Sequence, residues 1–253
     1  MRFVTALFLF AALQSPALAQ TGGANLAADA KTAVGQLRLY LDDVAKSGAR
    51  PDFTKPPASE LFARVFDVEQ LGALPPPQAD DIPWLLDWIA AASQASKAIM
   101  VFGTKPPADA VAAARDAAFV RNVLDYQDQQ AIELDFLIRA AARESVAMLA
   151  FMQQLPPEQR TPIREAGLKK ARLGFADMIS NALGSLVDEH FKPTYARRVS
   201  VAMRDTGEIW LGALLPDDRV KIMSQLQWAQ LRVKDDEAQE NLAVFSAVLA
   251  AAK

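Results

Sequence analysis

Apolar residues recur along most of the chain at alternating steps of four and three, and strand-like alternation of apolar and polar residues is nearly absent. Steps of three and four residues bring side chains onto one face of an α-helix. The pattern therefore predicts an all-α protein, an irregular bundle of about seven to eight helices.

Two segments, residues 134–152 and 168–186, carry unbroken apolar seams. Only a short turn, residues 155–162, separates them, so the two helices must lie antiparallel. We expect this long helical hairpin to be the core of the fold, with Phe175 as a buried side chain. The seams consist of Leu134, Ile138, Ala141, Ser145, Met148 and Met152, and of Leu168, Ala171, Phe175, Met178, Ala182 and Leu186.

Prolines and acidic residues mark where further helices begin. Pro193 and Pro216 each stand at the start of a periodic segment, and Asp235 opens the last one. Proline is tolerated in the first turn of a helix, and acidic side chains favour its positive end. The same reasoning predicts a helix from Trp84 to Val101, a short helix over residues 60–71, one helix over residues 193–213, a kink near residues 125–130, and a stiff extended linker over residues 50–58.

The first nineteen residues have the three parts of a signal peptide. Met1-Arg2 is basic, residues 3–13 are apolar, and Ala17-Leu18-Ala19 supplies the small residues of a cleavage site. The sequence therefore predicts cleavage between Ala19 and Gln20 and a periplasmic or secreted protein. Residues 20–253 then form a single all-α domain. An alternative division has an N-terminal subdomain over 31–105 and a C-terminal helical bundle over 107–253.

Composition limits the remaining functions. The chain has no Cys, which leaves neither disulfides nor thiolate chemistry, and its formal net charge of −3 is unsuited to neutralising the phosphates of nucleic acid. After residue 19 no segment offers eighteen consecutive apolar residues, so we do not expect an integral membrane protein after signal cleavage. No sequence motif implies a cofactor.

Catalytic chemistry finds little support in the sequence. A di-iron bundle needs two histidines and the chain has one, His190; neither a Gly-x-Ser-x-Gly nor a Ser-x-x-Lys motif occurs. We therefore expect no enzyme, no catalytic residue and no metal ligand. His190 is interpreted as a residue that assists a helix end, with an acid–base cluster of Asp188, Glu189 and His190 as the alternative.

A second acidic group could bind a hard cation, but a solvated helix face is the favoured interpretation. It consists of Asp125, Asp128, Glu133 and Asp135. Asp135 and Arg139 stand four residues apart, in the order that suits a surface ion pair.

Basic residues supply the candidate interaction surface, although an ordinary surface of mixed charge is the alternative. The set is Arg160, Arg164, Lys169, Lys170, Arg172, Arg197, Arg198 and Arg204. An envelope protein, or an anionic lipid or glycan surface, is the kind of partner that would dock there. The sequence thus predicts an exported, non-catalytic protein that binds or scaffolds another envelope protein. The alternative is a carrier of a lipid or other apolar ligand, held between the helix over residues 84–101 and its neighbours.

Overall fold

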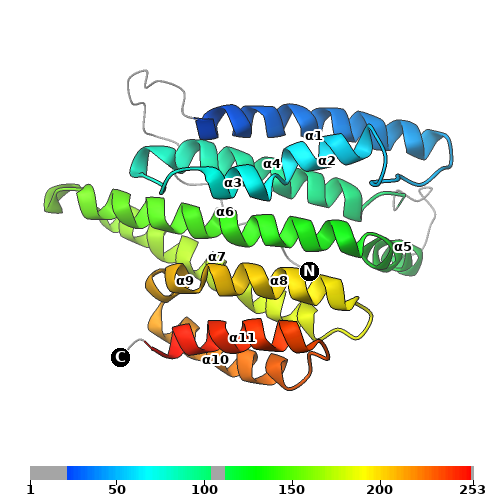
Figure 1. Ribbon diagram of the computed structural model, residues 1–253. Coiled ribbons are helices and arrows are strands. Elements are labelled where there is room, and N and C mark those ends of the chain that lie inside the picture. Colours follow the sequence, from blue (N-terminus) through cyan, green and yellow to red (C-terminus); the bar gives the residue numbers. More distant parts are fainter. Residues whose placement is uncertain (1–21, 104–111, 252–253) are drawn as a thin grey trace.

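The computed structural model describes residues 22–103 and 112–251, with side chains from residue 116 onward in the second range, and within them the protein is all-helical without strands (Figure 1). The predicted signal peptide, its cleavage site at Ala19 and Gln20, and the division between residues 105 and 107 lie outside the described residues. The helices are α1 (Gly22–Lys46), α2 (Ala58–Val65), α3 (Val68–Ala73), α4 (Ile82–Met100), α5 (Ala112–Asp125), α6 (Gln127–Gln154), α7 (Pro162–Leu186), α8 (Pro193–Asp205), α9 (Gly207–Ala213), α10 (Pro216–Gln230) and α11 (Asp236–Ala250). Two 3-10 helices, η1 (Ala79–Asp81) and η2 (Pro157–Gln159), precede α4 and α7.

The structure has more helices than the seven to eight that the sequence predicted, because segments predicted to be single helices are interrupted. The segment over residues 60–71 divides into α2 and α3 at Asp67, whose carboxylate accepts a hydrogen bond from the Gln70 amide (2.8 Å) and so caps α3. The segment over residues 193–213 divides at Thr206. Its hydroxyl donates to the carbonyl of Ala202 (2.7 Å) and accepts from Trp210 Nε1 (2.8 Å).

The expected helix boundaries are confirmed where the sequence offered explicit signals. Helices α8 and α10 begin at Pro193 and Pro216, and the Asp235 carboxylate accepts from the Ala238 amide (3.0 Å) at the start of α11. Gly48, two residues after the end of α1, has a φ of 71°, a left-handed conformation in which a larger residue would be strained. The predicted extended linker over residues 50–58 is wrong, because the segment contains turns and places the Phe53 ring 5.6 Å from that of Phe62.

Helix α6 occupies the centre of the bundle. It packs against α4 on one side and α8 on the other, while α1 covers α4 and α11 covers α8 (Figure 1). Its contact with α7 is less extensive than its contacts with α4 and α8, and α7 packs mainly on α10. The prediction that the hairpin of α6 and α7 is the core of the fold is therefore not confirmed; the contacts centre on α6 alone.

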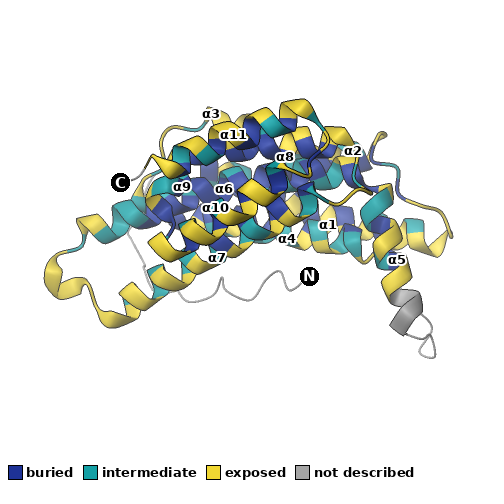
Figure 2. Ribbon diagram, turned by 90° about the horizontal axis from the view of Figure 1, so that it is seen from below, coloured by how far each residue is buried: buried dark blue, intermediate teal, exposed yellow. Residues whose placement is uncertain are grey.

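Large aromatic side chains join these helices into one continuous apolar core. Trp88 of α4 donates from Nε1 to the Val65 carbonyl (2.9 Å), and its ring centroid lies 5.1 Å from that of Phe136 in α6. Phe175 of α7 lies 5.7 Å from Trp210 of α9. Buried residues line the facing sides of the helices. Exposed residues concentrate at the turn that connects α6 to α7 (Figure 2). No described helix is long and apolar enough to cross a membrane.

Candidate binding site

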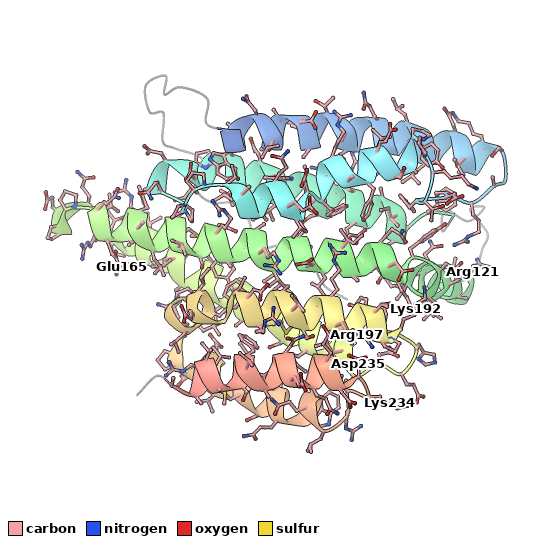
Figure 3. The ribbon with its side chains drawn as sticks, viewed as in Figure 1. Arg121, Glu165, Lys192, Arg197, Lys234 and Asp235 are labelled. Atoms are coloured by element: carbon pink, nitrogen blue, oxygen red, sulfur yellow. The ribbon has the colours of Figure 1, made fainter. Side chains whose placement is uncertain are left out.

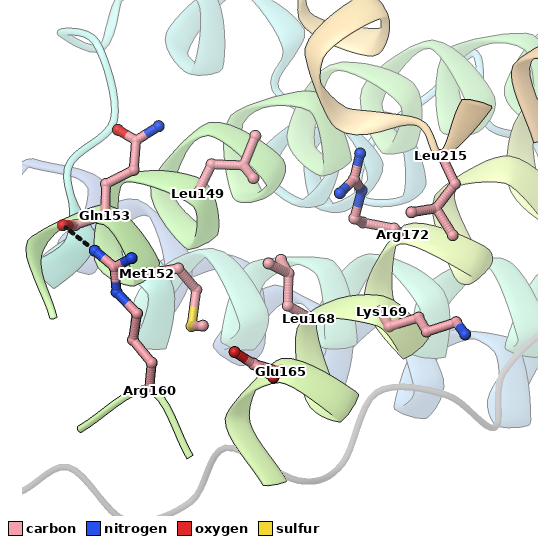
Figure 4. A pocket seen from close by; sticks show the side chains of 9 residues that line it. All are labelled: Leu149, Met152, Gln153, Arg160, Glu165, Leu168, Lys169, Arg172 and Leu215. Atoms are coloured by element: carbon pink, nitrogen blue, oxygen red, sulfur yellow. Dashed lines mark hydrogen bonds between the residues drawn. The ribbon is translucent and has the colours of Figure 1, made fainter. Parts of the chain in front are cut away.

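A pocket of about 370 Å³ lies where the C-terminal part of α6 meets the first turns of α7, and Leu215, just before α10, closes one side of it (Figure 4). The chain turns back at η2, so this end of the two helices extends beyond the rest of the bundle (Figures 1 and 2). The prolines of the turn end α6 and allow the chain to reverse into α7. The pocket between these two helices therefore lies at an exposed end of the molecule. Residues 149–172 make up this α6–α7 end.

The pocket combines apolar surface with positive charge. Its apolar lining is Leu149, Met152, Leu168 and Leu215, and its charged lining is Arg160, Lys169, Arg172 and one acid, Glu165, with Gln153 completing the set. Three cations against one carboxylate give the pocket a net positive charge. Such a lining suits a ligand that is partly apolar and negatively charged.

Helix ends hold the two arginines in place. Arg160 donates from Nε to the Leu155 carbonyl (3.0 Å) and from Nη2 to the Gln153 carbonyl (3.2 Å), at the C-terminus of α6. Carbonyls in the last turn of a helix lack intrahelical partners and carry the negative end of the helix dipole, so they attract a guanidinium.

Arg172 is held in the same way at the end of α9. It donates from Nε to the Ala213 carbonyl (2.5 Å) and from Nη2 to the Leu214 carbonyl (2.8 Å). In the described part of the chain, no carboxylate lies within ion-pair distance of Arg160, Lys169 or Arg172. The two guanidinium groups are thus held in position by carbonyls, and the charges of all three side chains remain open to an anionic ligand.

The predicted basic set divides into two groups. Arg160, Lys169 and Arg172 come together in the pocket. Arg164 lies beside it, donating to the Gln159 carbonyl (2.7 Å) with its guanidinium 5.9 Å from the centre of the Phe151 ring. Lys170 is exposed on the same turn of α7 and does not line the pocket.

The other group lies on α8, and each of its arginines is paired with an acid. Arg197 contacts Asp235 at 2.8 Å, far from Glu165 at the α6–α7 end (Figure 3). Arg198 contacts Asp135 at 2.9 Å, and Arg204 contacts Asp205 at 2.7 Å. Each guanidinium thus has a carboxylate beside it, and the pairs of Arg197 with Asp235 and of Arg198 with Asp135 support the packing of α8 on α11 and α6.

Of the four acids predicted to form a solvated face, Asp125 and Asp128 are exposed, whereas Glu133 and Asp135 lie inside the protein, so the prediction is wrong for these two. Glu133 is buried, its Oε2 accepts from Ser96 Oγ (2.7 Å), and its Oε1 has no hydrogen-bond partner in the described part of the structure. Burial raises the pKa of Glu133 to about 8 and that of Glu144, three turns further along α6, to about 7. Asp135 is buried too, and its carboxylate pairs with Arg139 (2.6 Å).

His190 lies in the turn after α7 and is two-thirds exposed (67%). Its Nδ1 lies 2.8 Å from Asp188 Oδ1, and its backbone N–H donates to the same oxygen (3.0 Å). The backbone hydrogen bond, followed by the contact with the ring, lowers the pKa of Asp188. The ring therefore contacts a carboxylate, and the expectation that it would act on carbonyls at the helix end is wrong.

Replacing His190 with Gln should cost less than about 1 kcal/mol of stability, because an exposed pair is largely solvated before it forms. Chemical denaturation of the variant measures this cost. A variant that folds normally but loses its cellular function would contradict the non-catalytic interpretation.

The chain matches no protein-family model, no curated protein and no solved structure. Among the described residues, no cluster of three His, Cys, Asp or Glu side chains has the geometry to hold a metal ion.

The sequence indicated the pocket cations but not Leu215, the apolar side chain that closes one side of the pocket. Leu215 precedes Pro216 and carries no periodic signal, and only the packing of α10 on α7 brings it to the pocket. For Glu133 and Glu144 a signal exists. Their spacing of eleven residues is close to three helical turns, so both face the same side of α6.

Proposed function

We propose that this chain is an exported, non-catalytic protein of the periplasm or cell exterior that acts by binding another envelope protein at its α6–α7 end. The signal-peptide pattern of residues 1–19 supports export. One structural observation supports the site: an open pocket with apolar lining and unpaired cations, at an end of the bundle that extends beyond its core.

The chemistry of the lining favours binding over catalysis. Acid–base catalysis needs a donor and an acceptor in reach of one substrate atom, and nucleophilic catalysis needs a nucleophile beside a base. The pocket instead presents leucines, a methionine, three cations and the single carboxylate of Glu165. Apolar area supplies affinity, and fixed charge supplies orientation and a faster encounter.

Photo-crosslinking in the native host tests this proposal. A photoreactive amino acid at Ile163, which is 77% exposed at the start of α7, should capture an identifiable envelope protein. The matched control is the same amino acid at Leu39, which is 67% exposed on α1. Equal capture at both positions, or capture of cytosolic proteins alone, would contradict the proposal.

The second candidate function is a carrier of a lipid or other apolar ligand, and the pocket volume of about 370 Å³ favours it, since small-molecule sites start at roughly 300 Å³. The expected place was around the helix over residues 84–101. There, however, Trp84, Trp88 and Ile99 are buried in the core, so the α6–α7 end is the better location. Native mass spectrometry of the purified protein separates the two functions, because a carrier should retain a copurified ligand.

A further inference from the structure

The pocket at the α6–α7 end has positive charge at both ends of an apolar centre. Arg160 lies beside Met152 and Gln153 at one end, whereas Arg172 and Lys169 lie toward Leu215 at the other (Figure 4). Leu149 and Leu168 lie between them, together with the single carboxylate of the pocket, Glu165. A ligand that satisfies the whole pocket therefore needs an apolar middle and negative charge on both sides.

The length of the pocket sets the length of that ligand. On α7 the lining residues run from Glu165 to Arg172, seven residues apart, so at 1.5 Å per residue they span about 10 Å along the helix. An extended peptide of about three residues covers this distance. A fatty acid carries charge at one end only and would leave the cations at the other end without a partner.

The two arginines are ready to receive carboxylates. Each donates its Nε and Nη2 hydrogens to helix-end carbonyls, and a guanidinium has five N–H groups, so the Nη1 donors remain available. Because these bonds already restrict the side chains, binding orders them at little further entropic cost. Arginine also pairs with carboxylates more specifically than lysine does.

We propose that the pocket binds a short segment of the partner protein in which apolar side chains are flanked on both sides by acidic residues. The proposal rests on the proposed binding function and specifies its ligand. The apolar side chains lie against Leu149, Met152 and Leu168, and the flanking carboxylates meet Arg160 at one end and Lys169 with Arg172 at the other.

Fluorescence anisotropy with a labelled, end-blocked peptide of sequence Asp-Asp-Leu-Phe-Leu-Asp-Asp tests the proposal on the mature protein. This peptide should bind, and binding should weaken as salt is raised, because the ion pairs are partly exposed. Replacing its four Asp by Ser, or its three apolar residues by Ser, should each weaken binding about tenfold or more. Retention of full affinity by either control peptide would overturn the proposal.

Two neighbouring lysines give a matched pair of protein variants. Lys169 lines the pocket and Lys170 does not, although both are exposed on the same helical turn. Lys169→Glu should weaken peptide binding about tenfold, and Lys170→Glu should change it less than about twofold. Equal losses in both variants would show nonspecific attraction and overturn the proposal.

A competition experiment with dodecanoate completes the test. Failure of dodecanoate to displace the peptide supports a two-ended ligand, whereas displacement without any peptide selectivity points to a carrier of single-chain amphiphiles and overturns the proposal. If the peptides fail to bind but photo-crosslinking at Ile163 still captures an envelope protein, the ligand proposal fails and the proposed function stands.

Discussion

Replacing Phe175 with alanine should lower the free energy of unfolding by about 3 to 5 kcal/mol, as truncation of a buried aromatic side chain does. The Phe175 side chain is 6% exposed, and its ring packs 5.7 Å from that of Trp210. Removing the ring leaves a cavity between α7 and α9 and exposes the edge of Trp210. Urea denaturation followed by circular dichroism measures the loss.

Leu173→Ala is the matched control for Phe175→Ala. Leu173 lies on the same helix two residues earlier but is 42% exposed, so its truncation should cost less than about 1 kcal/mol. If the two variants unfold at the same denaturant concentration, α7 does not pack on α9 as described.

Replacing Glu133 with Gln should stabilise the protein at alkaline pH by up to about 5 kcal/mol. A buried carboxyl without a cationic partner resists ionisation, and in Glu133 one oxygen has Ser96 as its partner while the other has none among the described residues. Glutamine keeps the shape and the contact with Ser96 but carries no charge at any pH.

The sign of the pH dependence follows from the raised pKa of Glu133. The folded protein holds the proton up to about pH 8, whereas the unfolded chain releases it near its ordinary value of 4.5. Between these values the folded state binds more protons, so the contribution of Glu133 to stability is complete below pH 4.5 and declines as the pH rises toward 8. Glu144, with a pKa of about 7, adds a decline of the same sign.

Denaturation of the Glu133→Gln variant and the natural protein at about pH 5 and about pH 9 measures this effect. The two proteins should unfold alike at the lower pH and separate at the higher one. Glu165→Gln serves as the control. Because Glu165 is exposed, this variant should unfold like the natural protein at both pH values. A Glu133→Gln variant that loses stability equally at both pH values would show that the carboxylate is not buried as an isolated charge.

The all-helical class and many helix boundaries could be predicted because they depend on local chemistry. Pro193 and Pro216 can occupy only the first turn of a helix without breaking it, and Asp235 accepts a hydrogen bond from an amide three residues ahead. Such interactions involve neighbours in the sequence, so the pattern of residues already contains them.

The breaks and the buried acids could not be predicted in the same way. The break at Thr206 depends on a hydroxyl that joins the end of α8 to Trp210, and apolar periodicity continues across it. Glu133 is buried because α6 is covered by α4 and α8 on opposite sides. Periodicity alone indicates a single buried face, so an acid off that face is expected to be exposed to solvent.

The basic residues show the same limit for the candidate site. Arg197, Arg198 and Arg204 belong to the same predicted basic set as the pocket cations, but each has a carboxylate from its own or another helix beside it. The pairing of a charge depends on tertiary neighbours. Only the structure therefore separates the paired arginines of α8 from the open cations of the α6–α7 end.

If the partner binds in the pocket at the α6–α7 end, its photo-crosslinking at Ile163 should depend on Lys169, which lines the pocket, and not on Lys170, which does not. In the native host, Lys170→Glu should leave capture of the envelope partner unchanged, and Lys169→Glu should reduce it about tenfold. Equal capture in the two variants would contradict binding at this site, because it would place the partner outside the pocket that Lys169 lines.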